Sequence, residues 1–284
     1  MERIQWFPGH MTKAMREMEE KKKLCDGVVC VLDARAPAAT VNRNLLHTLE
    51  GKPVLYVLNK GDLAGAEAED FVRMIRRKGA PCLLCNSLNV SSRHILLSEM
   101  QKITATKQER AQAKGLNRVF RFMVIGVPNT GKSTLINILN GEKKAQTGDK
   151  AGVTRATRWI HCGEFDLMDT PGTMPPSFDD QRLAKHLAYI GSINDDILHM
   201  DDIALALLEE LATLCPQGLK NRYNLAEIGT PLEMLEGVCR RMGFVVRGGE
   251  YDFERGEKAV IDDFRKGRIG KITLEKADDY EELF

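Results

Sequence analysis

Short apolar runs alternate with helical patterns between residues 28 and 170. The runs that predict strands are Val28–Leu32, Val54–Leu58, Pro81–Leu84, Phe120–Ile125, Thr157–His161 and Phe165–Met168. Apolar positions at helical spacing predict helices over Ala64–Lys78, Ser92–Ala113 and Lys132–Leu139, and a further helix near the start with Pro8 in its first turn. This alternation is typical of a mostly parallel sheet with helices on both faces, so the predicted class is α/β.

The character of the chain changes after Pro175-Pro176, where the strand signal fades. A helix is predicted after the acidic pair Asp201-Asp202, and another after Thr230-Pro231-Leu232-Glu233, which has the residues of a capping box. We therefore expect two domains, an α/β domain over residues 1–178 and a small helical domain over residues 179–284.

Composition and charge narrow the class of protein. The 284 residues are 43% hydrophobic and 29% charged, which excludes a disordered or fibrous chain. No apolar run approaches the roughly 18 residues of a spanning helix, and the start lacks an apolar signal core, so we expect a cytoplasmic protein without a membrane partner. Residues 1–184 carry 28 basic against 20 acidic side chains and residues 185–284 carry 13 against 20, which suggests domains with different partners.

The seven cysteines are an odd number and lie mostly in apolar runs. We expect reduced, buried thiols, since Cys82 and Cys85 form a C-x-x-C that no second pair completes.

A phosphate-binding motif stands between a predicted strand and a predicted helix. Gly126 to Ser133 reads Gly-Val-Pro-Asn-Thr-Gly-Lys-Ser, a complete G-x-x-x-x-G-K-[ST]. Backbone N–H groups of such a loop surround a triphosphate, Lys132 bridges the outer phosphates, and the Ser133 hydroxyl coordinates Mg²⁺. The sequence therefore predicts a nucleoside triphosphate and Mg²⁺ as ligands.

A second motif selects the base. Asn59-Lys60-Gly61-Asp62 is an N-K-x-D at the carboxyl end of a predicted strand, and the Asp62 carboxylate can accept hydrogen bonds from N1 and N2 of guanine. Adenine lacks the matching donors, and such pairing can discriminate by about 10⁴-fold. We expect GTP and GDP rather than ATP, with a backbone amide near Asn86-Ser87 reaching guanine O6.

A third motif predicts the metal and switch residues. Asp169-Thr170-Pro171-Gly172 is a D-x-x-G downstream of the P-loop, in which Asp169 holds Mg²⁺ through water and the Gly172 amide senses the γ-phosphate. Thr154 is our candidate to complete the Mg²⁺ shell, with Thr147 and Thr157 as alternatives.

The order of the motifs differs from that of an ordinary GTPase. Here N-K-x-D and Asn86-Ser87 precede the P-loop, whereas they ordinarily follow D-x-x-G, so the sequence predicts a circularly permuted GTPase. The permutation attaches the tail directly after the nucleotide-sensing segment. The residues expected to contact the nucleotide are Asn59, Lys60, Gly61, Asp62, Asn86, Ser87, Asn129, Thr130, Gly131, Lys132, Ser133, Thr134 and Gly172, and those expected at the metal are Ser133, Thr154 and Asp169.

Five segments in order carry a family resemblance. They are Ile4 to Met11 (Ile-Gln-Trp-Phe-Pro-Gly-His-Met), Asp33-Ala34-Arg35-Ala36-Pro37, Asn59 to Asp62, Gly126 to Ser133 and Asp169 to Gly172. Over residues 1 to about 180 the chain resembles the YlqF/RbgA family of circularly permuted GTPases that assist assembly of the large bacterial ribosomal subunit. The resemblance implies ribosomal RNA and the large subunit or its precursor as partners.

The resemblance also implies roles for two residues. His10 matches the histidine to which the family assigns a catalytic role, and Asn129 matches the P-loop asparagine of potassium-stimulated GTPases, so K⁺ is a hypothetical second cation. Gly172 is followed by Thr173-Met174, so the glutamine that orients water in many GTPases is missing. Arg240-Arg241 and Arg265-Lys266-Gly267-Arg268 are candidate RNA contacts, with a plain solvated face as the alternative.

Two functions remain open from the sequence. The first is a GTP-hydrolysing assembly factor whose turnover the ribosomal particle stimulates. The second is a slow-hydrolysing, nucleotide-gated binding module or checkpoint regulator, which the missing glutamine favours when the protein is alone. A tRNA-modifying or membrane-stalk GTPase is disfavoured by the permutation and by the lack of a further catalytic or spanning segment.

Overall fold

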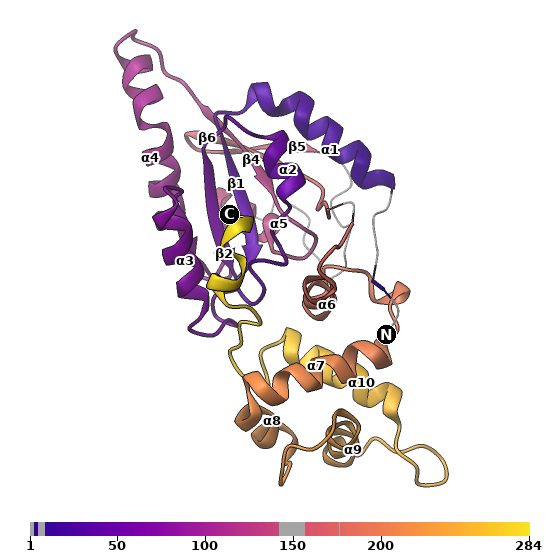
Figure 1. The fold of residues 1–284 in the computed structure, drawn as a ribbon. Helices are drawn as coiled ribbons and strands as arrows, with labels where there is room; N and C mark the ends of the chain where they lie inside the picture. Colours follow the sequence, from indigo (N-terminus) through magenta and orange to yellow (C-terminus); the bar gives the residue numbers. More distant parts are fainter. Residues whose placement is uncertain (1–2, 5–8, 142–156, 176) are drawn as a thin grey trace.

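The computed structural model describes residues 3–4, 9–141, 157–175 and 177–284. Within these residues six strands form one sheet in the order β3-β2-β1-β4-β6-β5 (Figure 1). Neighbouring strands are parallel except that β5 runs antiparallel to β6. This confirms the predicted α/β class with a mostly parallel sheet. The strands are β1 (Gly27–Asp33), β2 (Val54–Asn59), β3 (Cys82–Leu84), β4 (Phe120–Ile125), β5 (Arg158–Cys162) and β6 (Phe165–Asp169).

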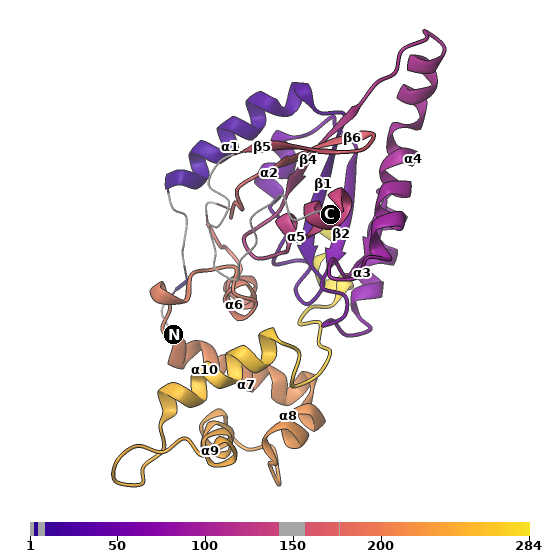
Figure 2. The ribbon, with the colours of Figure 1, turned by 180° about the vertical axis from the view of Figure 1, so that it is seen from behind.

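Helices cover both faces of the sheet because alternate residues of each strand point to opposite faces. In β1, Val28, Cys30 and Leu32 belong to the apolar cluster that includes α1 (Gly9–Lys21), α2 (Arg43–Thr48) and α3 (Ala68–Arg77). Val29 and Val31 belong to the cluster with α4 (Ser92–Gln112) and α5 (Lys132–Asn140). Figure 2 shows α4 and α5 from behind, with α4 projecting beyond the sheet.

Contacts with the tail adjust one predicted helix boundary. The helical pattern begins at Ala64, yet α3 begins at Ala68. The amide of Gly65 donates instead to Oγ1 of Thr273, 3.2 Å away near the end of the chain. The opening helix is present from Gly9, and Pro8 lies outside the described residues.

The tail forms helices, most of which pack in one apolar cluster that also includes Met11, Ala36 and Val127 of the first part of the chain. The tail helices are α6 (Gln181–Tyr189), η2 (Asp195–Ile197), α7 (Met200–Leu214), α8 (Pro216–Tyr223), α9 (Pro231–Met242), α10 (Phe253–Arg265) and η3 (Ala277–Leu283). A short 3-10 helix, η1 (Lys22–Leu24), follows α1 outside the tail. Both predicted starts are confirmed. Asp201 and Asp202 lie in the first turn of α7, and Thr230 and Glu233 form the capping box of α9.

The last residues of the chain return to the sheet. Helix η3 packs on α3, and the ring of Phe284 lies 5.9 Å from that of Phe71 and 6.0 Å from that of Tyr56. The backbone amide of Leu274 donates to the carbonyl of Arg35 at 2.8 Å. The division into residues 1–178 and 179–284 stays a prediction, and the final segment packs against the first of these two parts.

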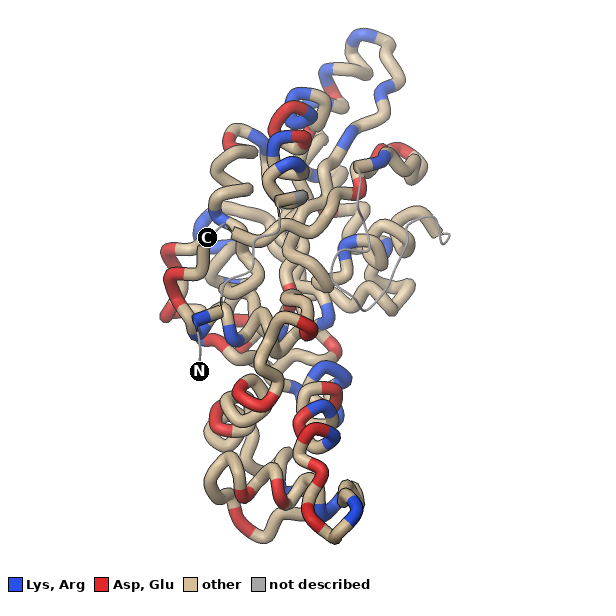
Figure 3. The backbone as a smooth tube through the Cα atoms, turned by 90° about the vertical axis from the view of Figure 1, so that its right-hand side faces the viewer, with Lys and Arg blue, Asp and Glu red and all other residues tan. Residues whose placement is uncertain are grey.

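The structure also bears on membrane spans, on the cysteines and on the distribution of charge. In the part of the chain that the structure describes, no helix is long and apolar enough to cross a membrane. All seven cysteines carry free thiols, and all except Cys215 are buried. Figure 3 shows basic residues along the projecting end of α4 and the connection after it, whereas acidic and basic residues intermingle in the tail.

Candidate nucleotide-binding site

The P-loop connects β4 to α5, as the sequence predicts. Gly131 has a φ of +91°, and a Cβ there would lie 2.2 Å from the side-chain nitrogen of Asn59, so only glycine fits. The ammonium of Lys132 is buried inside the loop and donates to the carbonyl of Val127 at 2.8 Å. Burial lowers the pKa of Lys132 to about 8. A phosphate in the loop would supply the negative partner that this cation needs.

Asn59 joins three of the predicted motifs. Its side-chain nitrogen donates to the carbonyl of Thr130 in the P-loop at 2.9 Å, and its side-chain oxygen accepts from the amide of Ser87 at 3.0 Å. Asn59 is buried. The N-K-x-D segment, the Ser87 loop and the P-loop are therefore held in one place although the first two precede the third along the chain.

Lys60 links the base side of the site to a carboxylate at the end of β1. Asp33 and Asn59 are cross-strand neighbours in the parallel pair β1–β2, which brings the following Lys60 to Asp33. The Lys60 ammonium lies 2.9 Å from Oδ2 of Asp33 and donates to the carbonyl of Asn129 at 2.5 Å. Lys60 also has a left-handed backbone, with φ of 60°. Lys60 therefore joins the N-K-x-D segment to β1 and to the P-loop.

Asp33 also forms a buried, two-pronged ion pair with Arg35. Nε of Arg35 donates to Oδ1 at 2.9 Å and Nη2 donates to Oδ2 at 2.7 Å. Burial alone would raise the pKa of Asp33, but the charges of Arg35 and Lys60 outweigh it and hold that pKa well below its usual range. Asp33 and Arg35 were absent from the predicted site residues. Their position at the carboxyl end of a strand is the signal that could have included them.

Asp62 and Asn86 lie at the edge of the site. The side chain of Asp62 is exposed, so a guanine base can reach its carboxylate. The amide of the preceding Gly61 donates to the carbonyl of Cys85 at 2.8 Å. The amide of Leu88 donates to the side-chain oxygen of Asn86 at 2.8 Å. The amides of Ser87 and Leu88 thus both have side-chain partners within the protein, so contact with guanine O6 would require one of these hydrogen bonds to change.

The D-x-x-G segment lies beside the P-loop. A Cβ on Gly172 would lie 2.7 Å from the backbone nitrogen of Pro128, so this glycine permits the close approach of the two segments. The hydroxyl of Thr170 donates to the carbonyl of Val124 at 2.6 Å, and the amide of Thr173 donates to the carbonyl of Gly126. The segment is therefore anchored to β4 on one side and to the P-loop on the other.

The residues at the predicted metal position fit Mg²⁺. Asp169 is buried, and its Oδ1 atom has no hydrogen-bond partner, which is costly unless a cation or its water arrives there. Burial raises the pKa of Asp169, while Lys132 and a hydrogen bond from Ser133 act in the opposite direction. Thr154 lies outside the described residues, as does its alternative Thr147. The other alternative, Thr157, is hydrogen-bonded to Lys21 and Glu17 of α1 instead.

One cavity lies beside the P-loop and the loop at Ser87. It has a volume of about 780 Å³, large enough for a nucleotide, and its wall includes residues of the P-loop, the base side and the tail. The residues that line it include Lys60, Ser87, Asn129, Gly131, Thr134, Asp262, Arg265 and Lys266. Sequence reasoning had no signal for the contribution from the tail.

The tail also holds the P-loop directly. The side-chain nitrogen of Asn129 donates to the carbonyl of Gly191, which follows α6, and the hydroxyl of Ser192 donates to the carbonyl of Pro128 at 2.7 Å. Asn129 has a left-handed backbone with φ of 62°. The P-loop asparagine is thus a contact between the nucleotide site and the tail.

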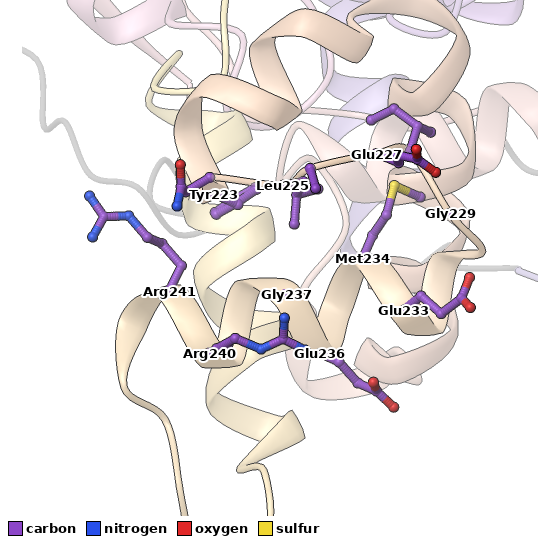
Figure 4. A pocket seen from close by; sticks show the side chains of 13 residues that line it. Tyr223, Leu225, Glu227, Gly229, Glu233, Met234, Glu236, Gly237, Arg240 and Arg241 are labelled. Atoms are coloured by element: carbon purple, nitrogen blue, oxygen red, sulfur yellow. The ribbon is translucent and has the colours of Figure 1, made fainter.

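The candidate RNA residues in the tail have other contacts. Both guanidinium terminal nitrogens of Arg265 lie 2.7 Å from the Asp195 carboxylate, and Arg268 pairs with Asp262 and Asp263. Arg240 and Arg241 line another cavity of about 640 Å³, between α8 and α9 (Figure 4). Figure 4 shows Glu227, Glu233 and Glu236 around the same cavity, so its charge is mixed rather than basic.

Comparisons with known proteins agree with this geometry. A family model described as "50S ribosome-binding GTPase" matches residues 121–228. The protein named ribosome biogenesis GTPase A from Bacillus licheniformis is 37% identical over 280 residues, which cover 97% of this chain and 99% of that protein. Its namesake from Bacillus cereus is also 37% identical, over 98% of this chain and 96% of that protein. The crystal structure of GNP-bound YlqF from T. maritima matches with a TM-score of 0.66 and 24% identity, over 93% of this chain and 98% of that chain, and so supports the fold. The chain belongs to the YlqF/RbgA family of ribosome biogenesis GTPases.

Proposed function

We propose that this protein binds and hydrolyses GTP with Mg²⁺ and assists the assembly of the large ribosomal subunit in the cytoplasm. The observation that carries the proposal is the side chain of Asn59, which is hydrogen-bonded to the P-loop at Thr130 and to the loop at Ser87, although these motifs occur in permuted order. The names of the matching relatives supply the ribosome as the partner.

Each group has a role that its surroundings support. Lys132 and the P-loop amides bind the phosphates, Asp62 selects guanine, and Ser133 and Asp169 hold Mg²⁺, with Thr154 as the proposed third residue. When bound, Mg²⁺ supplies charge neutralisation to the outer phosphates. The remaining nucleotide contacts are proposed for Asn59, Lys60, Gly61, Asn86, Ser87, Asn129, Thr130, Gly131, Thr134 and Gly172.

The water-orienting group is proposed to come from outside the D-x-x-G segment. Met174 is buried and apolar, and Thr173 is buried with a side chain much shorter than that of glutamine, so we infer that neither residue replaces the missing glutamine. Helix α1 supports His10 for this role. Met11, the next residue, contacts Met174 through its sulfur, which accepts from the Met174 amide at 3.4 Å. The start of α1 therefore lies against the segment that follows Gly172.

A nucleotide-gated binding module is the second candidate, because the lack of a local water-orienting side chain favours slow hydrolysis by the protein alone. Steady-state GTP turnover with and without purified large subunits separates the two. For the assembly GTPase we expect that large subunits stimulate GTP turnover and that Lys132→Ala abolishes this turnover. Nucleotide-dependent binding to the subunit without stimulated turnover would identify the module.

A further inference from the structure

The cavity for the nucleotide is lined by the P-loop, by residues on the base side and, on a third wall, by residues of the tail that belong to no GTPase motif. Asp262 and Arg265 of α10, and Lys266 just after it, line this wall. Asp262 and Lys266 are four residues apart, and the Lys266 ammonium lies 2.8 Å from the Asp262 carboxylate. The wall therefore presents a carboxylate with a neighbouring cation.

The covalent structure of a nucleotide determines what faces this wall. On the proposed function, the phosphates lie on the P-loop beside Gly131 and Thr134, and the base lies beside Lys60 and Ser87. The ribose connects these two ends, so it occupies the middle of the cavity. Its 2′- and 3′-hydroxyls are hydrogen-bond donors that need acceptors when they leave water.

The guanidinium of Arg265 is bound to other residues of the tail and so holds this wall in place. Besides its ion pair with Asp195, Nε donates to the carbonyl of Tyr189 at 2.9 Å and Nη2 donates to the carbonyl of Ala188 at 2.8 Å. These bonds tie α10 to the end of α6, which in turn contacts the P-loop through Gly191 and Asn129. The position of α10 relative to the phosphates is thus fixed by side chains on both sides of the cavity.

We propose that the Asp262 carboxylate accepts hydrogen bonds from the ribose hydroxyls of bound GTP or GDP, which makes α10 of the tail part of the nucleotide site. The proposal rests on the proposed function and adds the ribose to the groups that are recognised. A carboxylate has several lone pairs for a vicinal diol and is a common ribose partner in dinucleotide-binding folds. Lys266 and Arg268, which lie 2.8 and 2.9 Å from Asp262, hold this carboxylate in place. Its side chain is 45% exposed, so a ligand can reach it.

The test compares GDP with 2′,3′-dideoxy-GDP by calorimetry on the full-length protein. Wild type should bind GDP about 10-fold more tightly than 2′,3′-dideoxy-GDP, because one hydrogen bond to a charged group contributes about this factor to the affinity. Asp262→Ala should bind both ligands with the affinity that wild type has for the dideoxy compound. Glu254→Ala is the matched control because Glu254 lies on the same helix with its own partner at i+4, Lys258. This variant should keep the wild-type preference.

Two results would overturn the inference. Wild type could bind both ligands equally, or Asp262→Ala could weaken both by the same factor, which would indicate a structural role. If Asp262→Ala proves unstable, Asp262→Asn replaces it in the test, because asparagine keeps the size of the side chain. Asp262→Asn should show a reduced preference for GDP over the dideoxy compound, and an undiminished preference would also count against the carboxylate. Lys132→Ala separates this inference from the proposed function. If Lys132→Ala binds GDP as tightly as wild type does, the proposed function fails. If Lys132→Ala loses GDP binding but wild type binds GDP and 2′,3′-dideoxy-GDP equally, only the role of Asp262 is removed.

Discussion

Nδ1 of His186 lies 2.8 Å from Oε1 of Glu275, and both side chains are completely buried. The pair joins α6 to the segment that returns to the sheet. Glu275 also accepts from the amides of Ala38 and Ala39, at 2.6 and 3.1 Å, and Nε2 of His186 lies 3.2 Å from Glu210 of α7. One buried cluster thus connects the loop after β1, two tail helices and the end of the chain.

This cluster predicts a pH-dependent stability. Burial alone would lower the pKa of His186, but hydrogen bonds to Glu210 and Glu275 outweigh it and raise the pKa to about 9. Because this is above the ordinary value of about 6.5, the contribution is complete below about pH 6.5 and is lost as the pH rises through about 9. Its size is about 3 kcal/mol. Urea unfolding at pH 6.5, 7.5 and 9 should show that the stability difference between wild type and His186→Gln shrinks as the pH rises.

The control for this experiment is His161→Gln. His161 is 66% exposed and pairs with Asp166, so it is also a histidine beside a carboxylate but on the surface. Its replacement should leave the pH profile of unfolding nearly unchanged. A constant difference between wild type and His186→Gln across this range would contradict the buried charge.

Replacement of Lys132 should separate binding from stability. Lys132→Ala removes a buried cation whose burial is unfavourable, so the nucleotide-free protein should unfold at the same or a higher temperature. GDP affinity should fall by about 100-fold or more, because the charged hydrogen bonds to phosphate are lost. Calorimetry and thermal unfolding give the two readouts, and a variant that binds GDP normally would show that the loop does not hold phosphate.

Base choice should depend on one carboxylate. Asp62→Asn exchanges an acceptor for an amide donor, which matches the 2-oxo group of xanthine better than the 2-amino group of guanine. We expect GDP affinity to fall by about 100-fold and XDP affinity to rise. Undiminished GDP affinity without any gain for XDP would remove Asp62 from base recognition.

The potassium hypothesis predicts faster turnover in K⁺ than in Na⁺ at equal ionic strength. Asn129→Gly should erase this difference, since glycine accepts the left-handed backbone at this position without strain and lacks the amide oxygen. Asn224→Gly is the control because Asn224 is also left-handed, with φ of 55°, but caps α8 in the tail. Equal turnover of wild type in both salts would show that no such cation site operates.

His10 is proposed to act in hydrolysis rather than in binding. His10→Ala should leave GTP affinity nearly unchanged while turnover stimulated by large subunits falls by about 10-fold or more, the lower range for a water-orienting group. His47→Ala, at an exposed histidine of α2, should behave as wild type. If stimulated turnover survives the loss of His10, the ribosomal particle itself must provide the catalytic group.

Local patterns predicted most of the sheet and its motifs. The strand β4 was predicted with its observed bounds, and β1 and β2 to within one residue at each end, because buried strands are continuous apolar runs. The six-residue helix α2 was missed since it is too short for periodicity to show. The antiparallel direction of β5 was not predicted either, as an apolar run carries no sign of its direction.

Long-range contacts were beyond sequence reasoning. The P-loop and Asn59 could be named because each motif is contiguous, whereas Gly191 contacts Asn129 across 62 residues of chain. Similarly, Arg265 was a candidate for RNA because of its basic neighbours. Its partner Asp195 lies 70 residues earlier, and only the fold brings the two together.

The return of the final segment to the sheet limits how the tail can move. Near Gly191 the tail is bound to the P-loop, and at Ile272 its backbone amide donates to the carbonyl of Leu63 at 3.1 Å. Between these two places, one apolar cluster contains Met11 and Val127 together with Leu207 of α7. A rotation of α7 to α10 as a unit would therefore have to break this packing as well as the hydrogen bonds, so a displacement of the segment after Gly172 can reach α8 and α9 only at the cost of contacts that the tail makes with the sheet.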